Sequence, residues 1–170
     1  MAGPGFSLKF GPLLRAIRGL KFARVLDVGC GSGELARGLL ARGIARLAVG
    51  VDKKATKPRP GAGWLFVRGR AESLPFRDGA FDLVVSTFAV HEFDDQYAGL
   101  KEMARVLRPG GLLVCLDWTK GAPVALGQNP LRPGEFENLL EAAGLSVRRV
   151  TRLRCKKVLV VAARSGERGK

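Results

Sequence analysis

The sequence predicts a doubly wound α/β domain, in which helices cover both faces of a mostly parallel sheet. Two observations lead to this fold class. Short apolar runs typical of buried strands alternate with segments whose apolar residues recur at helical spacing, which is the pattern of a parallel sheet. Turn-forming residues separate these segments, with 23 Gly and 9 Pro among the 170 residues. A chain of this length is expected to form a single domain, residues 1–170, whose core needs neither disulfides nor a metal ion.

The first half of the chain is expected to supply three strands and two helices. Pro12 marks the start of the first helix, and Gly43 ends the second. A basic loop rich in Pro and Gly, residues 53–63, separates the second strand from the third. The expected elements are a helix over 13–20 within an N-terminal helical segment 1–24, a strand over 25–28, a helix over 34–42, and strands over 47–51 and 64–67.

The second half is expected to complete the sheet. Residues 71–80 are too short and too rich in turn residues for a crossover helix, so at most one helical turn is expected there. The expected elements are a strand over 81–86, a helix over 95–107, a strand over 112–116, a helix from Pro133 to Gly144, and strands over 145–153 and 158–162. The short turn 154–157 joins the last two strands in a hairpin. The prediction is a Rossmann-like seven-stranded sheet, mostly parallel with an antiparallel C-terminal strand, followed by a disordered tail over 164–170.

Positive charge is concentrated near both ends of the sequence. The net charge is +14, and residues 1–24, 46–77 and 148–170 hold five, eight and nine Lys or Arg against zero, two and one acids. Residues 78–147 carry ten acids and five bases. Basic faces attract polyanions through counterion release, and RNA or a ribonucleoprotein is the commonest such partner. A solvated, Arg-rich surface that binds no polyanion is an equal alternative.

Cysteine usage and hydropathy bear on the compartment. Cys30, Cys115 and Cys155 are odd in number, widely separated and set in apolar stretches, which favours reduced thiols over disulfides or a zinc site. No apolar run reaches the roughly 18 residues that cross a bilayer, and the N-terminal residues lack the pattern of a secretory signal. We therefore expect a cytoplasmic protein without membrane contact or bound metal.

A glycine-rich turn, Asp27-Val-Gly-Cys-Gly-Ser-Gly33, follows the first expected strand. Glycine lets a backbone turn sharply and approach a ligand closely. The spacing is G-x-G-x-G, whereas dinucleotide sites have G-x-G-x-x-G. Asp27 stands two residues before the first glycine, where a carboxylate would repel a pyrophosphate but suits an ammonium group, as in the amino-acid end of S-adenosylmethionine. A turn that serves only strand-to-helix geometry is the alternative.

Asp52 lies at the end of the second expected strand, roughly 20 residues after the glycine turn. A carboxylate at this position can accept hydrogen bonds from both ribose hydroxyls of an adenosyl group. The alternative is a solvated Asp that caps a loop. Lys53 follows directly, so its loop is expected at the mouth of the same site.

Five motifs resemble, in order and spacing, the class I S-adenosylmethionine-dependent methyltransferases: Val25–Glu34, Gly50–Asp52, Ala71–Phe76, Phe81–Val85 and Arg105–Gly111. The resemblance covers about residues 22–163 and is strongest to the group that contains the quinone-biosynthesis methyltransferases. It implies that the glycine turn holds the methionine end, that residues 70–72 lie beside adenine, and that Ser86–His91 line the methyl-transfer channel. The expected cofactor-binding residues are Asp27, Gly29, Cys30, Gly31, Gly33, Asp52, Lys53, Ala71, Glu72 and Ser86.

One position departs from the family pattern. The family commonly carries an acid followed by Ala at the adenine edge, where the carboxylate accepts from the exocyclic amine. This chain has Arg70 before Ala71, and a guanidinium has donors only. The contacts to adenine then fall to the backbone of Ala71, to Glu72, or to packing on Leu74.

His91, the only histidine, is the candidate catalytic residue. It follows the fourth expected strand, and ligands of doubly wound folds bind at the carboxyl ends of the strands. With a near-neutral pKa it could act as a general base. Alternatively it hydrogen-bonds to the backbone and shapes the pocket, because methyl transfer from a sulfonium can proceed by alignment alone. Trp118, after the fifth strand, could either stack on the acceptor or pack in the fold.

Three functions remain open at this stage: methyl transfer to RNA or a ribosome-associated macromolecule, methyl transfer to a small molecule of the quinone type, or cofactor binding without catalysis. About 24 residues before the first strand and the 119–131 loop are all that could cover an acceptor. Such an open site favours a macromolecule, or a site completed by an activating protein partner or a homodimer. The residues expected to gather a polyanion are Lys53, Lys54, Lys57, Arg59, Arg148, Arg149, Arg152 and Arg154.

Overall fold

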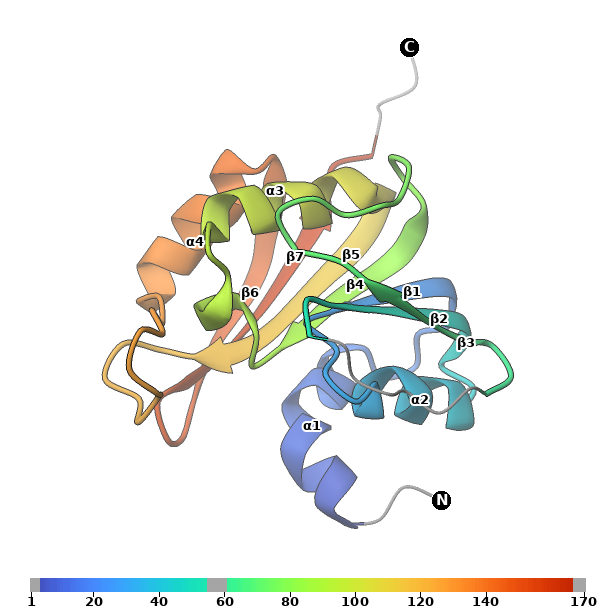
Figure 1. Cartoon of the computed structure of the whole chain (residues 1–170), viewed down its shortest axis with the longest axis horizontal. Coiled ribbons are helices and arrows are strands. Elements are labelled where there is room, and N and C mark those ends of the chain that lie inside the picture. The colour runs from blue at the N-terminus through green and yellow to red at the C-terminus, as the bar shows by residue number, and fades with distance from the viewer. Residues whose placement is uncertain (1–3, 55–60, 167–170) are drawn as a thin grey trace.

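A computed structural model describes residues 4–54 and 61–166 (Figure 1). Helices and strands alternate along it, as the sequence predicted. The elements are α1 (Pro4–Ala16), β1 (Phe22–Val28), α2 (Glu34–Ala41), β2 (Ala45–Asp52), β3 (Trp64–Arg68), β4 (Phe81–Thr87), the 3₁₀ helix η1 (Val90–Glu92), α3 (Gln96–Val106), β5 (Leu107–Trp118), α4 (Pro133–Ala142), β6 (Leu145–Leu153) and β7 (Lys157–Arg164).

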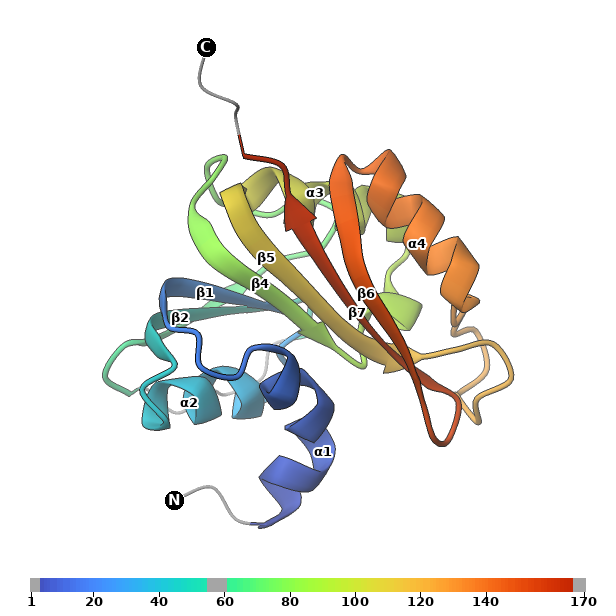
Figure 2. The same cartoon turned by 180° about the vertical axis from the view of Figure 1, so that it is seen from behind.

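The seven strands form one sheet in the order β3-β2-β1-β4-β5-β7-β6. Strands β1 to β5 pair in parallel, whereas β7 runs antiparallel to both β5 and β6. The predicted mostly parallel sheet with an antiparallel C-terminal strand is therefore confirmed. Figures 1 and 2 show α1 and α2 on one face of the sheet and α3 and α4 on the other.

Each face of the sheet has its own apolar core, because successive strand residues point to opposite sides. In β1, Val25 belongs to the core under α1 and α2, and Leu26 belongs to the core under α3 and α4. Asp27 therefore faces the α1 side, two positions after Val25. The alternation places a carboxylate at the edge of an otherwise apolar layer.

The chain reverses its winding direction between β1 and β4. The connection after β1 passes through α2 on one face, and the connection after β4 passes through α3 on the other. At such a switch point the connections that follow two neighbouring parallel strands leave in opposite directions. A crevice for a ligand then forms outside the carboxyl ends of these strands. The glycine turn lies at this crevice.

Helix α1 is longer than predicted, since it begins at Pro4 and contains Pro12 in its interior. The sequence prediction began the helix at Pro12 because proline lacks the N–H of an interior helical residue. The structure shows a buried stripe of Phe6, Phe10, Leu13 and Ile17 that carries the helix through the proline. Leu20, expected within the helix 13–20, lies after the end of α1 and is 42% exposed. Residues 22–24 belong to β1 rather than to the N-terminal segment.

The C-terminal part also departs from the expected boundaries. Strand β7 extends to Arg164, whose Nη1 donates to the carbonyl oxygens of Arg105 at 2.8 Å and Leu107 at 2.5 Å. Arg164 therefore belongs to β7 and not to the tail expected over 164–170, and residues 167–170 lie outside the described part of the chain. Among the described residues no helix is long and apolar enough to span a membrane.

Candidate active site

The glycine turn leaves β1 in a left-handed backbone conformation. Gly29, Gly31 and Gly33 have φ angles of 71°, 51° and 73°. A Cβ at Gly29 would lie 2.3 Å from the Cβ of Ala89, and one at Gly33 would lie 2.4 Å from the Trp64 ring, so neither position accommodates a side chain. A Cβ at Gly31 would meet no atom within 4 Å. Gly31 thus has no side chain that could enter the crevice beside the turn.

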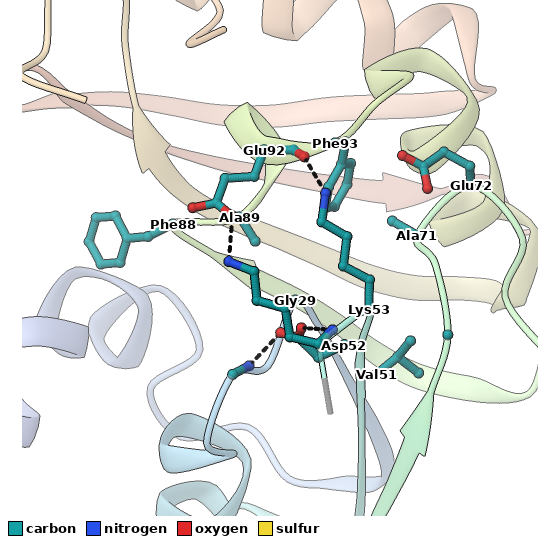
Figure 3. Close-up of a pocket in the computed structure, with 13 residues that line it drawn as sticks. Gly29, Val51, Asp52, Lys53, Ala71, Glu72, Phe88, Ala89, Glu92 and Phe93 are labelled. Carbon is teal, nitrogen blue, oxygen red and sulfur yellow. Dashed lines mark hydrogen bonds and ion pairs between the residues drawn. The ribbon is translucent and has the colours of Figure 1, made fainter. Parts of the chain in front are cut away.

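Two adjoining cavities lie beside this turn. The first has a volume of about 250 Å³ and is lined by six of the predicted cofactor-binding residues: Gly29, Gly31, Asp52, Lys53, Ala71 and Glu72 (Figure 3). The second, of about 230 Å³, contains Asp27 and Cys30 and is walled by Lys9 of α1. Gly29, Gly31 and Phe88 line both cavities. The pair can accommodate one elongated ligand that crosses the glycine turn.

Two of the predicted cofactor-binding residues line neither cavity. Gly33 packs against Trp64 and serves as the N-cap residue of α2. Ser86 is buried in β4, and its hydroxyl oxygen has no hydrogen-bond partner among the described residues. Gly33 therefore supports the turn without facing the ligand space, and Ser86 lies beneath the site.

Asp27 is the most unusual group in the site. Its side chain is buried, and neither carboxylate oxygen has a hydrogen bond of normal geometry among the described residues. Burial raises the pKa of Asp27 from 3.8 to about 7, and the charge of Asp52 adds to this rise. The backbone N–H of Ala36 and the ammonium group of Lys9 favour the charged form but do not offset the desolvation. Among the described residues, no cation forms an ion pair with Asp27.

The ligand-free protein is expected to lose stability as the pH rises from about 4 to about 7. Asp27 has a raised folded-state pKa, so the folded protein holds this proton across that range while the unfolded chain releases it. The shift corresponds to at most about 4 kcal/mol. Urea unfolding of the wild type and Asp27→Asn at several pH values isolates the effect, because their difference in unfolding free energy should grow over this range and level off above it. A difference independent of pH would contradict the assignment.

Asp52 lies at the end of β2, beside the glycine turn (Figure 3). Its Oδ2 accepts from the backbone N–H of Gly31 at 2.8 Å, and its Oδ1 accepts from the backbone N–H of Lys54 at 2.9 Å. Each carboxylate oxygen can accept a further hydrogen bond. The geometry thus fixes the Asp52 side chain and leaves capacity to bind a pair of hydroxyl groups.

A network of charges borders the other side of the cavity. Glu72 accepts from the backbone N–H of Asp94 at 2.8 Å, and Arg70 pairs with both Glu72 and Asp94. Lys53 donates to the carbonyl oxygen of Glu92 at 3.1 Å (Figure 3). Arg70 does not line the cavity. The departure from the family pattern therefore places a cation on the rim rather than in the ligand space.

The sequence left three possible contacts to adenine open, and the structure shows which of these residues line the first cavity. Ala71 and Glu72 line the first cavity. Leu74 is buried in the core under α3 and does not reach it. The backbone of Ala71 and the side chain of Glu72 thus remain as the available contacts.

His91 is held in η1 by a buried partner. Its Nδ1 lies 2.5 Å from Oδ1 of Asp117, and its backbone N–H donates to Oδ2 of the same residue at 3.2 Å. Burial lowers the pKa of His91, but the hydrogen bond and charge of Asp117 raise it more, so the net pKa lies above the ordinary value. His91 lines neither cavity of the glycine turn. This geometry favours the alternative in which His91 shapes the site, since η1 connects Ala89 and Glu92 of the wall.

Replacing His91 by Asn is expected to destabilise the protein by about 3 kcal/mol at pH 6, because Asp117 would be left buried without its cationic partner. A raised folded-state pKa means that the stabilisation is present below the unfolded pKa of 6.5 and declines as the pH rises through the folded value. Urea unfolding at pH 6 and pH 8.5 tests this. A variant with unchanged stability and no methyl transfer would instead identify His91 as a general base.

A comparison with protein families places the chain. Residues 26–115, more than half of the chain, match a family model described as "Methyltransferase domain". The chain belongs to this family. The match confirms the resemblance to class I S-adenosylmethionine-dependent methyltransferases, and with it S-adenosylmethionine as the family's cofactor.

Curated relatives match over part of their length. An uncharacterised protein of Escherichia coli, YafE, is 48% identical over 58 residues, which are 34% of this chain and 28% of that protein. The demethylmenaquinone methyltransferase of Beutenbergia cavernae is 37% identical over 100 residues, which are 56% of this chain and 41% of that protein. The chain thus spans half or less of the length of the curated relatives it matches.

Solved structures show the same fold at low sequence identity. A chain from the complex of the Haloferax volcanii Trm112 methyltransferase activator with a methyltransferase has a TM-score of 0.85 at 19% identity, covering 95% of this chain and 91% of that one. The [4+2]-cyclase SpnF has a TM-score of 0.80 at 17% identity, covering 95% and 82%. A methyltransferase from Mesorhizobium loti has 0.77 at 21%, covering 92% and 98%. Because one neighbour is a cyclase, the fold alone does not assign a reaction.

The described residues fit S-adenosylmethionine. The buried, unpartnered carboxylate of Asp27 matches an ammonium group, and the free capacity of Asp52 matches a ribose. The missing Cβ of Gly31 leaves room between them. Among the described residues, no cluster of His, Cys, Asp or Glu is arranged to hold a metal ion.

Lys9, Phe88 and Ala89 are site residues that the sequence did not single out. Phe88 and Ala89 fall within the 86–91 stretch that the resemblance placed along the methyl-transfer channel. Lys9 carries no local signal, because α1 reaches the site only through packing against distant parts of the chain. Its Nζ pairs with Oε2 of Glu34 at 2.9 Å.

Proposed function

We propose that the chain transfers the methyl group of S-adenosylmethionine to an acceptor that enters beside Phe88. The observation that carries the proposal is the buried Asp27 carboxylate, which lines the second cavity and has no hydrogen bond of normal geometry among the described residues. When bound, the cofactor supplies an electrophilic methyl group on a sulfonium. In this proposal Asp27 binds the ammonium group and Asp52 orients the ribose. Lys9, which lines the cavity of Asp27 and pairs with Glu34, binds the carboxylate.

The chain contributes alignment rather than a proton acceptor in this proposal. Phe88 and Ala89 form an apolar stretch of wall between the two polar ends of the site. His91 is engaged by Asp117 and lies outside both cavities. Holding the acceptor in line with the methyl group is sufficient for a direct displacement.

We propose RNA or a ribonucleoprotein as the acceptor. The net charge of +14 and the open cavity mouth support a polyanion. The basic loop after β2 supports it less than expected, because Lys53 lies 3.4 Å from Asp94 and Lys54 lies 3.8 Å from Glu92. Lys57 and Arg59 fall outside the described residues. The polyanion is therefore expected to meet other cations near the site.

A small-molecule acceptor of the quinone-biosynthesis type is the second candidate. Its support is the relative from Beutenbergia cavernae, a demethylmenaquinone methyltransferase that is 37% identical over 100 residues. Such an acceptor is uncharged in its reacting ring and would use the apolar wall at Phe88 rather than the basic surface. The two candidates thus predict different salt dependence of binding.

We further propose that a protein partner or a second copy of the chain covers the site. The Haloferax volcanii neighbour comes from a complex with a methyltransferase activator. Strand β3 forms one edge of the sheet and leaves Leu65 55% exposed. An edge strand with an exposed apolar side chain is suited to pairing with another chain.

The cysteines support a reducing, cytoplasmic compartment as part of this proposal. Cys30, Cys115 and Cys155 are all free. Burial raises the pKa of the Cys30 and Cys115 thiols, so both stay protonated at neutral pH. Such thiols pack as small apolar groups rather than as nucleophiles.

Incubation with methyl-labelled S-adenosylmethionine and a fractionated cell extract, with and without ribonuclease, tests the proposed reaction. Ribonuclease-sensitive labelling is expected. Label in the lipid fraction would support the quinone-type acceptor instead. Cofactor binding without label in any fraction would identify a non-catalytic binding module.

A further inference from the structure

An aromatic pair and a lysine meet at the carboxyl ends of the central strands. Phe88 follows β4 and Trp118 ends β5, with ring centroids 5.3 Å apart and planes at 42°. The ammonium group of Lys157, at the start of β7, lies 5.1 Å from the Trp118 centroid and 5.8 Å from that of Phe88. All three residues are half-buried, so part of each side chain remains accessible.

The backbone is strained at Phe88 and in the β6–β7 turn that precedes Lys157. Phe88 has a φ of 54°, which bulky residues rarely adopt, and its N–H donates to the carbonyl oxygen of Leu116 at 2.8 Å. In the β6–β7 turn, Cys155 and Lys156 have φ angles of 58° and 54°, where such turns favour Asn-Gly. Strain of this kind persists where a site requires a particular geometry.

A basic groove leads away from the aromatic pair. It has a volume of about 260 Å³ and lies between α1 and the β6–β7 turn, which Figure 2 shows at the same end of the molecule. Its lining residues are Leu8, Lys9, Pro12, Leu116, Leu153, Arg154 and Lys157. Three of these are cations and none is an acid. Arg154 and Lys157 form no ion pair within the described residues.

The groove adjoins the cofactor cavities through shared walls. Lys9 lines both the groove and the cavity that contains Asp27. Phe88 lines both cavities of the glycine turn. Phe88 does not line the groove, but Lys157 does and its ammonium group lies over both aromatic rings. A ligand that runs from the groove past Lys157 can therefore present a ring at Phe88, beside the site proposed for the transferable methyl group.

We propose that this groove binds a single-stranded polynucleotide, with a base against the Phe88–Trp118 pair and its phosphates at Arg154 and Lys157. The inference rests on the proposed function and assigns the acceptor to a surface. Bases stack on accessible aromatic rings when they are not paired in a duplex. Cations without carboxylate partners are available to phosphates. RNA and DNA share this chemistry, so both are arms of the test.

The test uses tryptophan fluorescence, with S-adenosylhomocysteine present to fill the cofactor site. The chain has two tryptophans, and Trp64 is buried against the glycine turn, away from the groove. Twelve-nucleotide RNA and DNA single strands and a polyphosphate of similar charge are titrated at low salt. We expect the nucleic acids to quench the emission of the wild type and not that of Trp118→Phe, which keeps an aromatic ring but removes the reporter.

Charge variants test the phosphate contacts. Arg154→Ala with Lys157→Ala should weaken RNA binding by about tenfold or more and lower the log–log salt slope by about 1.4, or 0.7 for each lost contact. Lys101→Ala with Arg77→Ala removes the same charge from exposed residues outside the groove and should leave both quantities nearly unchanged.

Four outcomes would overturn the inference. These are no nucleic-acid binding at low salt, quenching that persists in Trp118→Phe, polyphosphate binding as tight as that of RNA, and equal losses in both pairs of charge variants. Tighter binding of RNA than of DNA would identify RNA as the polynucleotide that the groove binds. Calorimetry with S-adenosylhomocysteine distinguishes a failure of the groove proposal from a failure of the proposed function. Cofactor binding without RNA binding removes this inference alone, whereas absent cofactor binding removes the proposed function.

Discussion

Replacing Asp27 by Asn is expected to weaken S-adenosylmethionine binding by about tenfold or more at pH 7.5 while stabilising the ligand-free protein. The loss of a charge-assisted hydrogen bond costs about 1.5–3 kcal/mol of binding free energy. The same substitution removes a buried carboxylate whose pKa is raised to about 7 by desolvation, and so stabilises the fold by about 2–4 kcal/mol. Titration calorimetry and urea unfolding measure the two effects separately.

A truncated ligand provides the control for this variant. 5′-Methylthioadenosine lacks the amino-acid end of the cofactor, so its affinity should be the same for the wild type and Asp27→Asn. Asp52→Asn should instead weaken both ligands, because Asp52 is placed at the ribose. If Asp27→Asn weakened both ligands equally, a general distortion of the site would explain the loss, and the assignment of Asp27 to the ammonium group would be wrong.

Alanine at Gly31 is expected to weaken cofactor binding strongly in a protein that still folds. The φ of 51° makes the substitution strained by roughly 1–2 kcal/mol, but a Cβ there meets no atom within 4 Å. The new methyl group would occupy the space that the ligand needs, so S-adenosylhomocysteine affinity should fall by about a hundredfold, which corresponds to roughly 3 kcal/mol. Calorimetry measures the loss of affinity, and urea unfolding shows whether the variant still folds.

Gly29→Ala is the matched comparison. Its Cβ would lie 2.3 Å from the Cβ of Ala89, so this variant should lose stability, by about 3 kcal/mol, before any ligand is added. Wild-type affinity in Gly31→Ala would show that no ligand approaches the turn closely.

Much of the fold could be predicted because strands buried on both faces carry a strong local signal. The strand expected over 81–86 is β4 (Phe81–Thr87), most of whose residues are buried. Strand β5 was expected to begin at residue 112, yet it begins at Leu107 and includes Pro109, because Leu107 pairs with Phe81 across an irregularity in the register. The first helix was predicted to begin too late, because a proline signal is local. The apolar stripe that continues α1 past Pro12 is stabilised by tertiary packing.

The site residues likewise fall into those with a local sequence signal and those that only the tertiary fold brings together. The placement of Asp27, Gly31 and Asp52 beside the two cavities could be predicted, because each lies at or just after a strand end within a recognisable local pattern. The role of His91 could not, since its partner Asp117 is 26 positions away and only the fold brings them together. The contribution of α1 was likewise not predicted from the sequence pattern, because only the fold brings Lys9 to the cavity that Asp27 lines.

The most direct test of the central claim is titration calorimetry of the wild-type protein with S-adenosylmethionine, and with NAD in parallel, at pH 5.5 and pH 7.0. The cofactor's ammonium group stays largely protonated at both values, so the pH dependence reports on Asp27. We expect S-adenosylmethionine to bind about tenfold more tightly at pH 7.0, to release a proton on binding at pH 5.5, and NAD not to bind. Binding of NAD in preference to S-adenosylmethionine, or the absence of S-adenosylmethionine binding at both pH values, would contradict the account.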